Sequence, residues 1–357
     1  MGAKQACCLL ENSSYFASKT GKAIKLKQLF LLILGVVALT VFILFSDLGS
    51  IAKYVALADK VQYSVAFLSM ILGVIAYAVS WIFLLKSAKV KLSALKAIES
   101  TWISVFFNIM VPTASVSGEV VRILYVVKET NDNHGTVAAT VFLHRIIAFL
   151  PFIFGSIFGF LYLGLFYNLP SYLSSIIITI SSLLIFALFV LLLFIVRPHL
   201  SMKIGIKVAS FLDRFVPKRW KKGSSIIELT ERAFSEFEKS MNVLKRGKLG
   251  IFFSIVFAFL YWVFDVLVAY FVFSSLNFHI PFILIIAVYT IAISIQIIPI
   301  GIPGMVGFVE TVMSGLYTIA GVPFGLSVAA TVMIRLVMMW FEALVGGLIF
   351  WLYSRRP

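Results

Sequence analysis

The chain has 357 residues, of which 61% are hydrophobic and 13% are charged, and its mean hydropathy is +1.06. Soluble domains carry about 25% charged residues, and a soluble globule could not bury this much apolar side chain, so a soluble enzyme and a disordered chain are excluded. The net charge is +15, but the basic residues cluster between apolar runs, which is typical of cytoplasmic loops on anionic lipid and not of nucleic-acid binding.

The first 27 residues form a basic segment that is too polar for a signal peptide. About 20 apolar residues cross the hydrocarbon core of a bilayer. A first membrane half, residues 28–196, therefore begins with predicted spans at 28–45 and 63–85. Lysines precede the first span and follow the second, so we expect the N-terminus in the cytoplasm.

Residues 101–127 predict a broken element instead of a span. The apolar run 102–111 is too short to cross, stops at Pro112 and is followed by small polar residues up to Gly118. A second short apolar run occupies 120–127. Two half-spans around such a break are typical of a re-entrant or broken helical hairpin, which is tolerated only where protein buries it or where it lines a wet cavity.

Spans at 137–165 and 172–196 complete the first half, and the long polar segment 197–250 follows. Apolar residues recur there at helical spacing, which predicts an amphipathic helical elbow on the cytoplasmic membrane surface. A small soluble helical hairpin stays open as the alternative for its second helix.

The second membrane half, residues 251–353, has predicted spans at 251–275 and 325–352. A second broken segment, 283–320, lies between them. Helix-breaking residues interrupt this segment: Pro299, Pro303, Gly304 and Gly307. The basic pair Arg355–Arg356 places the C-terminus in the cytoplasm as well. The prediction is thus an all-α polytopic membrane protein with about six full transmembrane helices and two re-entrant or broken helical hairpins.

The two halves repeat one pattern at a spacing of 191 residues. Four features recur without a gap: Pro112 and Pro303, Glu119 and Glu310, the VAATV runs at 137–141 and 328–332, and Gly155 and Gly346. The predicted orientations of the matching spans are opposite, which predicts inverted-topology repeats. Interrupted helices at matching positions of such repeats indicate a substrate site near the bilayer midplane.

Ionisable residues inside apolar sequence cost about 2.5–3.5 kcal/mol each on insertion scales, so they need a partner or a wet cavity. Six of them are our candidate substrate-binding residues: Glu119, Arg122, His144, Arg145, Glu310 and Arg335. Arg145 and Arg335 have the strongest case, because a guanidinium holds a phosphate with two parallel hydrogen bonds.

Alternatives stay open for several of these groups. Glu119 and Arg122 are three residues apart and can simply pair on one helix face, and His144 serves either as a proton relay or as a satisfied polar residue. Asp265 and Glu342 are equally compatible with internal salt bridges. No soluble catalytic motif or metal-ligand spacing occurs, so we expect no catalytic residues, no metal and no cofactor.

Short motifs resemble a known family. Residues 111–112 with 117–119 and Arg122 resemble the "P…GE..R" stretch of the lysylphosphatidylglycerol synthase transmembrane, or flippase-like, family. Residues 303–310 resemble its later "PGG.G..E" stretch, and Arg145 resembles its mid-span arginine. The pattern departs from the family at His144 and Met305, where an acidic residue and a glycine are usual.

The resemblance implies the membrane half alone, without a synthase domain, which moves modified or lipid-linked polar headgroups between leaflets. The first hypothesis is therefore a multi-pass cell-membrane flippase for an anionic or lipid-linked headgroup, with membrane lipids as partners and no nucleic acid. The second is a non-catalytic membrane partner of a separate synthase or transferase. The third is an intramembrane lipid transferase with Glu119 or Glu310 as its base.

Overall fold

The computed structural model describes residues 48–111, 116–167, 246–294, 296 and 302–356, together with scattered positions between 175 and 244. Every element in this part of the chain is helical. Several predicted features lie outside the described residues: the segment 1–27, the span 28–45, Pro112, Pro299, and most of the span 172–196 and of the elbow 197–250. Of the elbow, Met241 and Leu244 are described, and both are buried.

Four long apolar helices have the length and composition needed to cross a membrane. They are α4 (Lys60–Ser87), α7 (His134–Phe166), α11 (Lys248–Ser275) and the continuous run Phe324–Ser354. The last run comprises α14 (Phe324–Arg335), the π-helical η4 (Leu336–Phe341) and α15 (Glu342–Ser354). The spans predicted at 63–85, 137–165, 251–275 and 325–352 lie inside these four helices, and a short helix, α3 (Leu48–Leu57), precedes α4.

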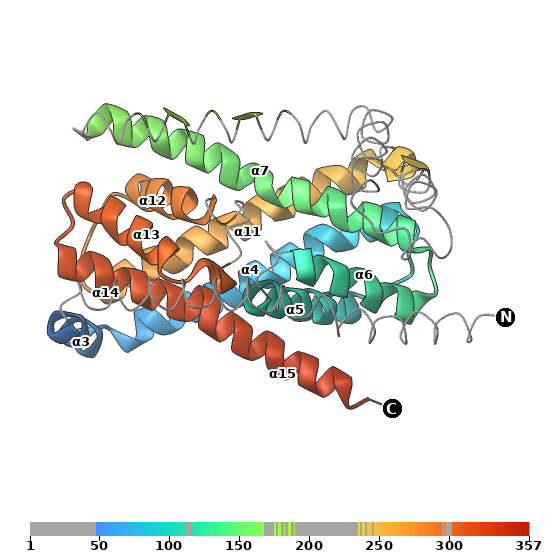
Figure 1. The fold of residues 1–357 in the computed structure, drawn as a ribbon, viewed down its shortest axis with the longest axis horizontal. Coiled ribbons are helices and arrows are strands. Elements are labelled where there is room, and N and C mark those ends of the chain that lie inside the picture. The colour runs from blue at the N-terminus through green and yellow to red at the C-terminus, as the bar shows by residue number, and fades with distance from the viewer. Residues whose placement is uncertain are drawn as a thin grey trace, which may run out of the picture.

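Shorter helices occupy the two segments that were predicted to be broken. The first consists of α5 (Ala94–Met110) and α6 (Val116–Thr130), which pack on each other. The second consists of α12 (Phe282–Ser294), the short 3-10 turn η3 (Pro303–Met305) and α13 (Phe308–Ile319). Figure 1 shows the α5–α6 hairpin in the end of the molecule where the C-terminus lies and the α12–α13 hairpin in the opposite end. Helix α5 contacts η3, so the first hairpin touches the described part of the turn in the second.

Helices α4 and α11 form the centre of the fold and pack antiparallel along their length. Near one end, the Ser80 hydroxyl lies 3.0 Å from that of Ser254. Near the other end, the Ser274 hydroxyl donates to the Gln62 side chain over 2.9 Å. This antiparallel pair leaves the two hairpins on either side of it.

The remaining long helices each pack closely against a hairpin through a glycine. A Cβ at Gly155 of α7 would lie 2.8 Å from Thr290 of α12, and a Cβ at Gly346 of α15 would lie 2.5 Å from the Trp102 carbonyl oxygen of α5. Both distances are shorter than real Cβ contacts, so only glycine permits these approaches. The helix that follows the first hairpin thus packs against the second hairpin, and the helix that follows the second packs against the first.

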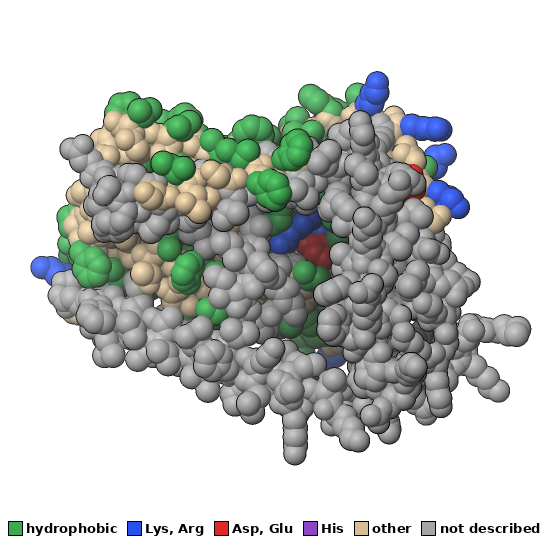
Figure 2. Space-filling view, turned by 45° about the horizontal axis from the view of Figure 1, so that its top comes forward, with side chains coloured by type: hydrophobic (Ala, Val, Ile, Leu, Met, Phe, Trp, Pro, Cys, Tyr) green, Lys and Arg blue, Asp and Glu red, His purple; other side chains and the backbone are tan. Residues whose placement is uncertain are grey.

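The surface has the character expected of a bilayer-spanning protein. Figure 2 shows apolar side chains spread over one face and Lys and Arg side chains gathered mainly at one end. The same view shows a hollow in the middle of the face, with basic and acidic side chains on its floor. Charged side chains within an apolar surround need a partner or water, so the hollow is a candidate functional site.

Candidate functional site

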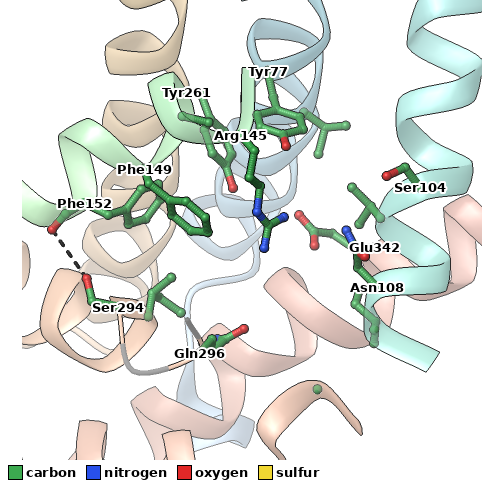
Figure 3. A pocket seen from close by; sticks show the side chains of 16 residues that line it. Tyr77, Ser104, Asn108, Arg145, Phe149, Phe152, Tyr261, Ser294, Gln296 and Glu342 are labelled. Atoms are coloured by element: carbon green, nitrogen blue, oxygen red, sulfur yellow. Dashed lines mark hydrogen bonds between the residues drawn. The ribbon is translucent and has the colours of Figure 1, made fainter. Parts of the chain in front are cut away.

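A cavity of about 190 Å³ lies where the two hairpins meet. Its lining comes from both halves of the chain and includes Asn108 of α5, Arg145 of α7, Gln296 after α12, Gly304 of η3 and Glu342 of α15. In Figure 3 the Arg145 guanidinium projects into the centre of this space, with Glu342 facing it and the rings of Tyr77, Tyr261 and Phe149 around it. The cavity therefore combines an aromatic wall with one cation and one carboxylate.

Arg145 is held at the cavity by an ion pair with the first hairpin. Its Nη1 donates to Glu119 Oε1 over 3.0 Å, and its guanidinium lies 4.5 Å from the centre of the Phe149 ring. The side chain remains 27% exposed. Because one edge of the guanidinium is used by Glu119, the remaining donors are available to a ligand in the cavity.

Arg122 and His144 lie behind Arg145 in the protein core. Arg122 is fully buried, forms an ion pair with the other oxygen of Glu119, and lies 4.5 Å from the centre of the Trp81 ring. Its Nη1 is 3.3 Å from His144 Nδ1, and His144 is also fully buried. These two predicted binding residues do not line the cavity: Arg122 pairs with Glu119, which holds Arg145 in place, and His144 contacts Arg122.

The N-terminus of α6 is held against α5 at Gly118, the glycine that ends the predicted break. The Gly118 N–H donates to the Asn108 side-chain oxygen over 2.8 Å, which satisfies a free donor at the helix N-terminus. A Cβ at Gly118 would lie 2.0 Å from the Ser104 carbonyl oxygen, so this position requires glycine. Asn108 thus joins the two arms of the first hairpin while it also lines the cavity.

Glu310 and Arg335 link the second hairpin to the long helix that follows it. The Arg335 Nε donates to Glu310 Oε1 over 2.6 Å, and the Gly307 N–H donates to Glu310 Oε2 over 2.7 Å. Arg335 also donates to the Gly304 carbonyl oxygen. Gly304 and Gly307 have φ of +55° and +85°, values that glycine adopts without strain. The predicted break residues Gly304 and Gly307 therefore form the turn, and Pro303 is the first residue of η3.

The two ion pairs occupy corresponding places. In each hairpin, a glutamate on the second arm pairs with an arginine on the long helix that follows: Glu119 with Arg145, and Glu310 with Arg335. They differ in access, because Glu310 and Arg335 are each only 6% exposed. Only the first pair reaches the cavity, so Arg145 is the sole one of the six predicted binding residues in the cavity lining.

The comparison with known proteins agrees with the motifs. The model of the family described as "Lysylphosphatidylglycerol synthase TM region" matches residues 32–346. The chain belongs to this family. Curated relatives with the same span are UPF0104 membrane proteins. One from Pyrococcus horikoshii is 27% identical over 91% of this chain and 96% of its own length, and one from Methanothermobacter thermautotrophicus is 25% identical over 90% and 94%. A third, from Methanocaldococcus jannaschii, is 23% identical over 90% and 93%.

This member of the lysylphosphatidylglycerol synthase transmembrane family is an integral membrane protein with several apolar helices. Within the described ranges, no group of three or more His, Cys, Asp or Glu side chains is arranged to hold a metal ion. The chemistry available in the cavity is therefore that of an arginine, a glutamate, amides, hydroxyls and aromatic rings.

Glu342 is the cavity residue that sequence analysis did not select. Its spacing of seven from Arg335 predicts a shared face on an α-helix. The π-helical η4 lies between them and adds about one residue to the turn, which rotates Glu342 by about 100° relative to a continuous α-helix. Arg335 therefore points to Glu310 while Glu342 lines the cavity. The only sequence signal was an acidic residue in mid-span.

Proposed function

We propose that the protein binds an anionic or lipid-linked polar headgroup in the central cavity and translocates it between the leaflets of the cell membrane. The observation that carries the proposal is the placement of Arg145, whose partly exposed guanidinium projects into a cavity between the two hairpins. A guanidinium offers two parallel donors to a phosphate and is always charged, so it selects this class of ligand. The ligand's acyl chains would stay in the surrounding lipid.

The arrangement of the helices supports two inverted halves. The hairpins enter from opposite ends, and Gly155 and Gly346, 191 residues apart, make reciprocal contacts with them. Glu119–Arg145 and Glu310–Arg335 repeat the same link in each half. We infer a fold of about six full spans and two hairpins in inverted repeats, with both termini in the cytoplasm. A site between such halves opens to each side in turn when the halves rock.

The second candidate is a non-catalytic membrane partner of a separate lipid-modifying synthase or transferase. It is favoured by Glu310 and Arg335, which satisfy each other and leave no open cation at the second hairpin. An intramembrane transferase has less support, because Glu119 and Glu310, its possible bases, are both held in ion pairs. The exposed guanidinium of Arg145 is not needed by either alternative, and for this reason we favour transport.

The test is headgroup translocation in reconstituted vesicles. The purified protein is inserted into vesicles that contain phosphatidylglycerol with a fluorescent headgroup label, and an impermeant quencher reports the fraction in the outer leaflet. We expect translocation by the wild type, a loss of at least tenfold in Arg145→Gln, and little change in Lys96→Gln. Lys96 is a suitable control because its ion pair with Glu129 lies in a partly exposed part of the first hairpin, away from the cavity.

Two results of this experiment would contradict the proposal. A membrane partner without transport activity would leave the wild type as slow as empty vesicles. Equal rates for the wild type and Arg145→Gln would show that translocation does not use the cavity cation. Either result overturns the proposal.

A further inference from the structure

Glu342 is a buried acidic side chain that the headgroup site does not use. It is 9% exposed, lines the cavity and lies near the middle of the span Phe324–Ser354. Among the described residues, no hydrogen bond or ion pair is made by its carboxylate; its electrostatic neighbours are Asp265 and Arg335, and Arg335 is paired with Glu310. Figure 3 shows that carboxylate directed into the cavity toward Arg145. A side chain with this burial and no partner needs a ligand or a neutral form.

The charged and titratable groups around Glu342 come from every neighbouring element. They are Tyr77 of α4, Arg145 of α7, Tyr261 and Asp265 of α11, Tyr289 of α12 and Arg335 of its own span. Arg145 and Arg335 already have carboxylate partners in Glu119 and Glu310. Asp265 is a second buried carboxylate, it accepts a hydrogen bond from the Tyr289 hydroxyl over 3.3 Å, and it interacts unfavourably with Glu342. Each of the two arginines is paired with another carboxylate, so neither forms an ion pair with Glu342, although Arg335 interacts favourably with it at longer range.

The charge balance of the central cluster shows what a proton would change. Arg122 and Arg145 share the single carboxylate of Glu119, so this group carries one excess positive charge. The Glu310–Arg335 pair is neutral. An ionised Glu342 would cancel the excess positive charge at the cavity, whereas a protonated Glu342 leaves the cavity cationic. An anion beside Arg145 is attracted more strongly in the second case.

We propose that Glu342 binds a proton taken from the water that reaches the cavity, and that this proton accompanies the anionic ligand bound beside Arg145. The step converts a carboxylate and a proton to a carboxylic acid, with no other bond changed. The coupling rests on the proposed function, whereas proton binding by Glu342 stands on the geometry alone. The protein would then carry a proton with each anionic headgroup.

The coupling has a definite sign. By linkage, an anion that favours the protonated form binds more tightly when the proton is already present. Its affinity is therefore highest at low pH and falls as the pH rises through the range in which Glu342 titrates. One proton per anion corresponds to a fall of up to about tenfold per pH unit. Glu342→Gln mimics the protonated form and is expected to keep the low-pH affinity at every pH.

The experiment uses the full chain in detergent and dihexanoylphosphatidylglycerol as the probe, because its phosphodiester keeps one charge near neutral pH. Binding is measured by calorimetry across the pH range for the wild type, Glu342→Gln and Glu99→Gln. Glu99 is a matched control because it is a paired glutamate at the membrane surface, bonded to Arg356. Infrared spectra of the same samples, without probe, record the carbonyl band of protonated carboxylic acids.

We expect a titrating carboxylic-acid band in the wild type and Glu99→Gln that is reduced in Glu342→Gln. The probe should shift this titration to higher pH, and only Glu342→Gln should bind it with pH-independent affinity. An identical band in all three proteins would overturn proton binding by Glu342. A wild-type affinity that is flat with pH, despite clear binding, would overturn the coupling. Failure of the wild type to bind the probe at any pH would overturn the proposed function and the coupling, while the band would still decide proton binding.

Discussion

Arg335 donates a 2.6 Å hydrogen bond to Glu310, and the two side chains bury each other almost completely at the turn of the second hairpin. The corresponding pair in the first hairpin, Arg145 with Glu119, has similar polar geometry but an arginine that is partly exposed in a cavity. The same kind of ion pair thus serves two purposes. The Glu310–Arg335 pair fixes the second hairpin in place, and the Glu119–Arg145 pair holds a cation at the cavity.

The buried pair predicts strong coupling between Glu310 and Arg335. Arg335→Met leaves the buried Glu310 carboxylate with the Gly307 N–H but without a cation, and is expected to lower the free energy of unfolding by about 3–5 kcal/mol. The double variant Glu310→Met/Arg335→Met removes both charges and should be more stable than Arg335→Met alone. Chemical unfolding in detergent, followed by tryptophan fluorescence, measures the cycle. Simple additivity of the two single effects would contradict the pairing.

Arg122 and Arg145 are expected to respond differently to the same substitution. Arg122→Met removes a fully buried guanidinium that pairs with Glu119 and stacks on Trp81, so we expect a loss of at least about 3 kcal/mol. Arg145→Met should cost about 1 kcal/mol or less, because Glu119 keeps Arg122 and the lost side chain is partly exposed. Thermal unfolding of the two variants in detergent compares them. Equal losses would refute the division into a structural and a cavity-facing arginine.

Gly118 and Gly315 are a matched pair for testing the close approach of α5 and α6 in the first hairpin. Alanine at Gly118 would place its Cβ 2.0 Å from the Ser104 carbonyl oxygen, so we expect a loss of about 1–3 kcal/mol or more. A Cβ at Gly315, within α13, meets nothing within 4 Å, and Gly315→Ala should stabilise the helix by about 0.5–1 kcal/mol. The same unfolding assay reports both. Tolerance of Gly118→Ala would show that the two arms lie further apart.

Cysteine labelling tests whether water reaches the cavity. Cys7 and Cys8 are first replaced by serine, and single cysteines are then placed at Val105 and Ile109, which line the cavity, or at Leu344, which is 58% exposed on α15. A charged, water-soluble thiol reagent should modify the first two in vesicles but not the third, because lipid covers Leu344. Modification at Leu344 and not at the two cavity positions would contradict this prediction, because it would show that water reaches the outer face of α15 and not the cavity.

Hydropathy located the helices well because each described span carries its own apolar run. The predicted span 137–165 lies inside α7, and the broken segment 101–127 corresponds to α5 and α6. The start of α5 was missed because Ala94–Glu99 is amphipathic and too polar for a hydropathy threshold, although Ser93 caps it. The length and polarity of an apolar run therefore predict the position of a span better than the residue at which a helix begins.

The site was predicted only in part, because charge in apolar sequence shows that a partner is needed but not which partner. Arg145 was marked as a charged residue within an apolar span and lies in the cavity lining, yet its separation from Arg122 depends on how α6 and α7 meet. The direction of Glu342 depends on the π-helical η4, and no residue pattern in Leu336–Phe341 signals that turn. Binding by the six candidate residues stays a prediction.

The crossed glycine contacts also bear on how the protein assembles during its synthesis. The contact that Gly346 makes with α5 forms only after the last long helix has left the ribosome, because Gly346 lies in that helix. The α12 face opposite Gly155 is filled as soon as the second hairpin inserts, because α7 is already in place. A first half made without the second would therefore lack the Gly346 contact on α5, although α4 and α7 would still pack against its hairpin.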